Sequence, residues 1–207
     1  MLPFASHQRA LPVATRVVAI LFLLLWAPIY WHFWGPANFI FLCDIAVILG
    51  CLGLASGNPL LISSQAVSIL PTSAFWTLDV VWHILFGGHI FSGAEYMFDP
   101  QYPLWLRLIS LFHIALPLAL LWALGRTGYD RRAFQLQCVV AILALLAARA
   151  AAPARNINFA FRDPFWNRQL GPAPLHLALI FLATALVLYL PVHLVLQKLL
   201  APPARIT

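Results

Sequence analysis

Long apolar runs occupy most of this chain and leave little freedom in how it can fold. Hydrophobic residues make up 63% of the 207 residues and charged residues only 9%, whereas soluble domains carry roughly 25% charged residues. In hydrocarbon, a spanning segment must satisfy its own backbone N–H and C=O groups, so such runs fold as helices. We therefore expect an all-α polytopic membrane protein in which residues 1–207 form a single bundle.

The apolar runs are separated by turns and short polar segments, and they predict six transmembrane helices. The first run is long and lacks a small-residue cleavage site, which favours a retained helix over a signal peptide. The third run contains Pro71 and several polar residues, so we expect it to be broken or strongly kinked. The predicted spans are residues 17–34, 38–54, 60–86, 104–124, 134–151 and 175–199.

Basic residues lie mostly between the apolar runs, which is typical of topology signals and lipid contacts rather than of nucleic-acid binding. With six spans, the positive-inside rule places both termini in the cytoplasm. The loop with Arg155, Arg162 and Arg168 then falls outside, against the rule. Either the span count differs by one, or these arginines pair with acids or hold an anionic group. We expect a multi-pass protein of a bacterial inner membrane, with membrane lipids and other membrane subunits as candidate partners.

The three cysteines, Cys43, Cys51 and Cys138, all lie inside apolar runs, and the sequence has no CxxC or CxxH spacing. This pattern argues against a disulfide framework and a structural zinc site. Cys51 and Cys138 are expected to be packing residues. No metal or cofactor is predicted.

Polar residues from all six predicted spans fall at a similar depth when helix length is counted at about 1.5 Å per residue. Such residues are costly in hydrocarbon and tend to face a bundle interior or a wet cavity. A shared depth therefore predicts a polar cavity that opens toward the outer leaflet. The residues concerned are His32, Cys43, Asp44, Asp79, His83, His89, His113, Arg149 and His176.

Two neighbouring residues near the start of the second span, Cys43 and Asp44, are the central candidates. Asp44 is either an orienting carboxylate or general base, or a structural anchor paired with Arg149 or His113. Cys43 is either an inert filler or a nucleophile, and a nucleophile would need a histidine in hydrogen-bond reach. His113 is either a satisfied core histidine or the deepest base available.

Asp79 and His83 are four residues apart, so on a continuous helix they share a face. They could neutralise one another, or the carboxylate could orient the histidine as a base. The same spacing suits two ligands of a metal or of a haem iron. In the longest loop, Arg155, Asn158 and Arg162 form either an anion-recognition rim or a solvated surface.

Three short blocks carry a family resemblance: LCDIA at residues 42–46, SLFH at 110–113, and NINF at 156–159 followed by GPAP at 171–174. Together they resemble the YwaF-type bacterial integral membrane family. That family is similar to the mammalian transmembrane ether-lipid acyltransferases and, more loosely, to the androgen-induced intramembrane fatty-ester hydrolases. Its histidine two positions before the cysteine is Phe41 here. The resemblance implies a nucleophile on the second helix and a histidine on the fourth, acting on a lipid acyl ester or thioester.

The leading hypothesis is accordingly a lipid acyl hydrolase or acyltransferase of the membrane. Two alternatives stay open: a non-catalytic subunit of a larger energy-transducing or pigment complex, and a haem-binding membrane subunit. The predicted catalytic residues are Cys43 as nucleophile, His113 as its base, and Asp44 and His83 as orienting groups; Arg155, Asn158 and Arg162 are predicted to contact an anionic headgroup.

Overall fold

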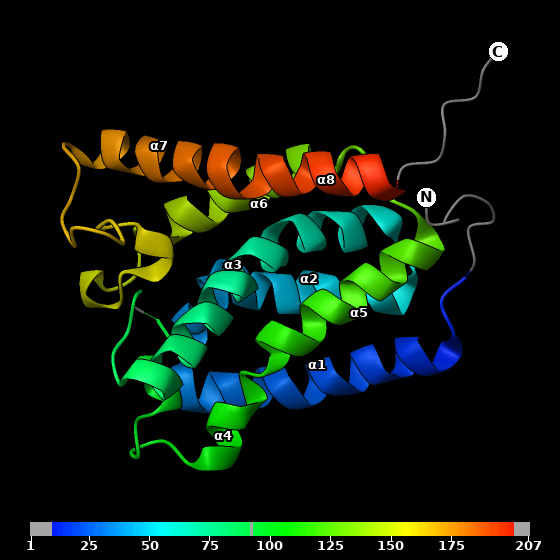
Figure 1. Ribbon diagram of the computed structural model, residues 1–207, viewed down its shortest axis with the longest axis horizontal. Helices are drawn as coiled ribbons and strands as arrows, with labels where there is room; N and C mark the ends of the chain where they lie inside the picture. Colours follow the sequence, from blue (N-terminus) through cyan, green and yellow to red (C-terminus); the bar gives the residue numbers. More distant parts are fainter. Residues whose placement is uncertain (1–9, 92, 201–207) are drawn as a thin grey trace.

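The computed structural model describes residues 10–91 and 93–200, and within these ranges the chain forms helices and loops without a β-strand. Its long helices lie alongside one another and alternate in direction along the chain (Figure 1). The α-helices are α1 (Val13–Trp34), α2 (Leu42–Ser56), α3 (Pro59–Phe86), α4 (Leu104–Ile109), α5 (Phe112–Thr127), α6 (Ala133–Ala148), α7 (Ala173–Ala183) and α8 (Leu190–Leu200).

Four helical stretches are long and apolar enough to cross a membrane: Val13–Trp34, Pro59–Phe86, Leu104–Thr127 and Ala173–Leu200. The apolar helices α2 and α6 are shorter, with 15 and 16 residues. The prediction of an all-α chain with membrane-length apolar helices is confirmed. The count of six spans and the cytoplasmic placement of the termini stay predictions.

The third predicted span differs from expectation, because α3 runs as one continuous helix through Pro71. Proline has no N–H to donate to the preceding turn. The next residue, Thr72, uses its hydroxyl to donate to the carbonyls of Ser68 (3.0 Å) and Ile69 (3.3 Å). At its start the side chain of Asn58 accepts hydrogen bonds from two first-turn amides, as an N-cap does. The helix is therefore not broken at Pro71, and the alternative, a strong kink there, stays a prediction.

Irregularities occur instead in the fourth and sixth predicted spans. The chain changes direction between α4 and α5, where Ser110, Leu111 and His113 donate to the carbonyls three residues earlier. Between α7 and α8 lies one π-helical segment, η5 (Thr184–Tyr189). Such segments often occur at functional sites or where a polar side chain is accommodated.

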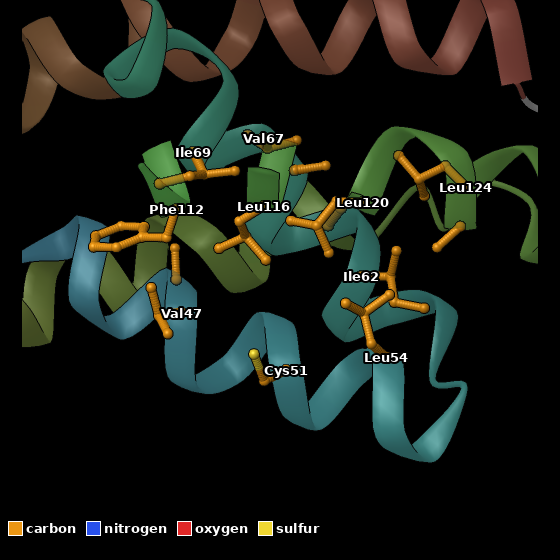
Figure 2. Close-up of a cluster of buried hydrophobic side chains, with 14 of the residues drawn as sticks. Val47, Cys51, Leu54, Ile62, Val67, Ile69, Phe112, Leu116, Leu120 and Leu124 are labelled. Atoms are coloured by element: carbon orange, nitrogen blue, oxygen red, sulfur yellow. The ribbon is translucent and has the colours of Figure 1, made fainter. Parts of the chain in front are cut away.

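The main hydrophobic core lies between α2, α3 and α5 (Figure 2). Cys51 is 3% exposed within it, among Val47, Leu54 and Ile62, as expected of a packing residue. This core holds α2 against α3 and α5. At one end of the bundle, on the left in Figure 1, α1, α3 and α6 end and α2 and α7 begin. Most of the predicted site residues lie at that end.

Candidate functional site

The structure places Asp44 in the first turn of α2, where it is 2% exposed. The side-chain amide of Asn38, from the preceding turn η1 (Pro36–Ile40), donates to Oδ2 of Asp44. The other carboxyl oxygen, Oδ1, lies 3.9 Å from Sγ of Cys43. The guanidinium of Arg155 donates to Oδ1 of Asn38 over 3.1 Å. We call the linked side chains of Arg155, Asn38, Asp44 and Cys43 the Asp44 network.

A second asparagine fixes the start of α2 from the far end of the sequence. The side-chain oxygen of Asn158 accepts the amide N–H of Leu42 (2.9 Å), and its side-chain nitrogen donates to the carbonyl of Ile40 (2.8 Å). Asn158 has φ 52° in the turn η4 (Ile157–Phe159), a left-handed conformation that asparagine tolerates well. The loop after α6 thus positions the backbone that carries Cys43 and Asp44.

The first turn of α2 also leaves one backbone donor available. The amides of Asp44 and Ile45 both donate to the carbonyl of Phe41, and that of Leu42 is taken by Asn158. Across the part of the chain that the structure describes, no backbone carbonyl accepts the amide N–H of Cys43. An unpaired N–H at a helix N-terminus favours negative charge beside it.

Two tyrosines lie close to this network, and sequence analysis did not single out either of them. Tyr30 of α1 shares a hydrogen bond of 2.9 Å with the hydroxyl of Ser110. Tyr96 lies in the turn η2 (Glu95–Met97). Burial raises the pKa of Tyr96, and the nearby Cys43 and Asp44 raise it further. Its phenol is therefore a neutral hydroxyl at the site, able to donate a hydrogen bond.

His113 is placed differently from its predicted role as base for Cys43. Its Nδ1 lies 3.3 Å from Oγ of Ser73, and its ring stacks on that of Trp76 with centroids 4.6 Å apart. The hydrogen bonds of the described chain join it to neither Cys43 nor Asp44. Arg149, the other expected partner of Asp44, donates instead to the carbonyl of Ala160.

Asp79 pairs with His89 rather than with His83. Its carboxylate lies 2.7 Å from Nδ1 of His89 and accepts the amides of Ile90 (2.6 Å) and Phe91 (2.9 Å). The left-handed Gly87 that ends α3 turns the chain back toward Asp79, which then caps the turn. His83 stacks on Phe98 with centroids 3.9 Å apart. The expected i, i+4 pair is therefore not formed, and within the described ranges His83 makes no hydrogen bond to the Asp44 network.

His176 also has structural partners. His176 is fully buried, lies 2.9 Å from the carbonyl of Phe159 and accepts the amide of Leu170. Among the residues that the structure describes, no three His, Cys, Asp or Glu side chains come together as a metal site would require.

The predicted anion-binding rim divides into two parts. Arg155 and Asn158 face inward and hold the Asp44 network and the start of α2. Arg162 is half-buried, and its guanidinium makes one long contact of 3.5 Å with the carbonyl of Ala154. The backbone between them is held by Asn156, whose side chain bonds to the amides of Phe161 and Arg162.

The fold of this loop should depend on pH through Asp163. Burial raises the pKa of its carboxyl, but hydrogen bonds from the amides of Trp166, Arg168 and Phe165 outweigh that effect and leave the pKa below the ordinary 3.8. Ionised Asp163 therefore stabilises the loop at neutral pH, and this contribution is lost as pH falls through the lowered pKa. We expect the protection of the amides of residues 163–168 against exchange, relative to an unfolded chain at the same pH, to fall below about pH 4. An Asp163→Ala variant should lack this protection at every pH. Unchanged exchange in that variant would refute this role.

No protein-family model, no curated protein and no solved structure matches this chain. The class of protein to which it belongs must therefore be inferred from its own structure. It is an all-helical chain with membrane-length apolar helices and, at one helix N-terminus, a half-buried thiol beside a buried carboxyl.

Proposed function

We propose that this chain is a lipid acyl hydrolase or acyltransferase of a bacterial inner membrane, with six spans, cytoplasmic termini and Cys43 as its nucleophile. The observation that carries the proposal is the 3.9 Å approach of Cys43 Sγ to Asp44 Oδ1 in the first turn of α2. Asn38 and Arg155 hold the carboxyl in place, and Asn158 holds the helix start. Because this end of the bundle carries the polar side chains, we place the reaction in the outer half of the bilayer.

Asp44, and not His113, lies next to the thiol, so it takes the role of general base. The thiol proton passes to the Asp44 carboxylate as Cys43 Sγ attacks the carbonyl carbon of a lipid acyl ester. The ester C–O bond breaks, a thioester forms, and Asp44 returns the proton to the departing alkoxide. Water then attacks the thioester in a hydrolase, or an acceptor hydroxyl does so in a transferase, and the thiol is regenerated.

Negative charge develops on the carbonyl oxygen as the thiolate adds. The candidate donors to this oxyanion are the amide N–H of Cys43, at the positive end of α2, and the hydroxyl of Tyr96. His113 stacks on Trp76 and His83 stacks on Phe98, so both histidines pack as structural side chains and take no part in proton transfer.

The test is covalent trapping of the acyl-enzyme. The purified protein in mixed micelles is incubated with the p-nitrophenyl ester of an alkynyl fatty acid, and the attached acyl chain is detected after reaction with an azide dye. We expect a label that hydroxylamine removes, as it does a thioester. Cys43→Ala should abolish the label, whereas Cys51→Ala and Cys138→Ala, the matched thiol controls, should keep it.

Asp44→Asn should slow labelling about 100-fold or more, since general-base catalysis contributes typically 10²–10⁴-fold. His113→Gln should leave the rate within a few-fold. Undiminished labelling of Cys43→Ala would refute the nucleophile, and a His113→Gln rate as low as that of Asp44→Asn would return the role of base to the histidine.

A further inference from the structure

A groove lies between α6 and α7. All of its lining side chains are apolar: Ile142, Leu145, Leu146, Leu177, Ala178 and Phe181. Most of α6 and α7 around it also presents exposed apolar residues, among them Leu143, Leu179 and Leu182. A groove of this kind between lipid-facing helices suits an alkyl chain.

A cation lies one helical turn above the groove. On α6 the lining residues Ile142, Leu145 and Leu146 are followed by Arg149, so these positions are spaced i, i+3, i+4 and i+7 and share one helix face. At about 1.5 Å per residue, Arg149 lies about 10 Å along the axis from Ile142. That offset matches a phosphate above the upper part of an acyl chain.

The guanidinium of Arg149 is held in place but not neutralised. It donates to the carbonyl of Ala160 over 3.1 Å and lies over the ring of Phe161, 4.2 Å from its centroid. Within residues 10–91 and 93–200, no carboxylate lies within 4 Å of it. An arginine has five N–H donors, and the structure assigns a protein acceptor to one of those on Arg149.

The surrounding loop adds positive charge and an anchor for a membrane surface. Arg162 and Arg168 lie on it, while its acid, Asp163, is already occupied by three backbone amides. Trp166 is 65% exposed on the same loop, and exposed tryptophans are typical of the membrane–water interface.

We propose that the α6–α7 face binds one anionic phospholipid, with its phosphate on Arg149 and an acyl chain in the groove. Charge complementarity selects the headgroup, and the apolar lining selects the chain. The site does not involve the thiol of Cys43, so it stands or falls separately from the acyl-transfer proposal.

Native mass spectrometry of the full chain tests this proposal, with phosphatidylglycerol and phosphatidylcholine of identical acyl chains as probes. We expect one phosphatidylglycerol to be retained in preference to phosphatidylcholine. Arg149→Gln should weaken phosphatidylglycerol binding about five-fold, the value of one basic residue near a lipid headgroup, while Arg149→Lys should restore part of it. Arg131→Gln, the same charge change on the exposed loop at the opposite end, is the control.

The alkyl-chain part has its own variant, because Ala178 lines the groove and is exposed. Ala178→Phe fills the groove from its open side and should abolish retention of the lipid, whereas Val187→Phe, outside the groove and 68% exposed, should not. Glycerophosphate binding as tightly as the lipid would show an anion site without a chain site and would overturn the proposal. If the protein is a dimer that Ala178→Phe dissociates, a second copy of the chain occupies the groove and the proposal is overturned. If Ala178→Phe and Val187→Phe lose lipid equally, the bound lipid is non-specific and the proposal is also overturned.

Discussion

Replacing Asn158 with alanine should lower the free energy of unfolding by about 3 kcal/mol. The change removes two hydrogen bonds and leaves the amide of Leu42 and the carbonyl of Ile40 without partners, at about 1 kcal/mol or more each. It also places an alanine at φ 52°, which costs about 1 kcal/mol. Chemical unfolding in mixed micelles, followed by helical circular dichroism, measures the difference.

Asn167→Ala is the matched control for this prediction. Asn167 has the same φ of 52°, but no side-chain hydrogen bond of the described chain involves it, and its side chain is exposed. It should therefore lose only the backbone contribution, about 1 kcal/mol. Equal losses in the two variants would show that the hydrogen bonds of Asn158 to the start of α2 contribute nothing to stability.

The apolar runs of the sequence predicted the helices well, because a membrane-length hydrophobic segment has few other ways to satisfy its backbone. Their interruptions were predicted less well. Pro71 suggested a break, yet α3 continues through it. Ser110 and Leu111 gave no comparable warning, although the chain changes direction there.

Pairing of site residues was harder to predict than their common location. Counting depth brought Asp44 and Arg149 to one end of the bundle, but it did not identify which residues touch. Arg155 reaches Asp44 through Asn38, a residue from which it is separated by 117 positions in the sequence. Spacing of four along α3 favoured Asp79 with His83, but helix periodicity says nothing of a later turn that returns His89 to the same carboxylate.

Replacing Gly53 with alanine should destabilise the packing of α2 against α3 by about 2 kcal/mol. A Cβ atom at this position would lie 3.0 Å from Cβ of Leu61, 3.1 Å from the backbone nitrogen of Ile62 and 3.2 Å from its Cγ1. The backbone atom cannot move aside as a flexible side chain can, and overpacking of this kind costs typically 1–3 kcal/mol. The two helices would have to separate where the short turn at residues 57–58 holds them together.

Gly50→Ala, one turn earlier on α2, separates this steric effect from helix propensity. Its Cβ would meet the two methyl groups of Leu116 at 3.4 and 3.7 Å and Cβ of Gln65 at 3.8 Å, which are ordinary contacts with side chains. Both substitutions gain roughly 1 kcal/mol or less of helix propensity, so Gly50→Ala should be neutral or stabilising while Gly53→Ala loses stability. The denaturant midpoint of each variant in mixed micelles gives the comparison. If the two midpoints move together, close approach of α2 and α3 at Gly53 does not limit the stability of the bundle.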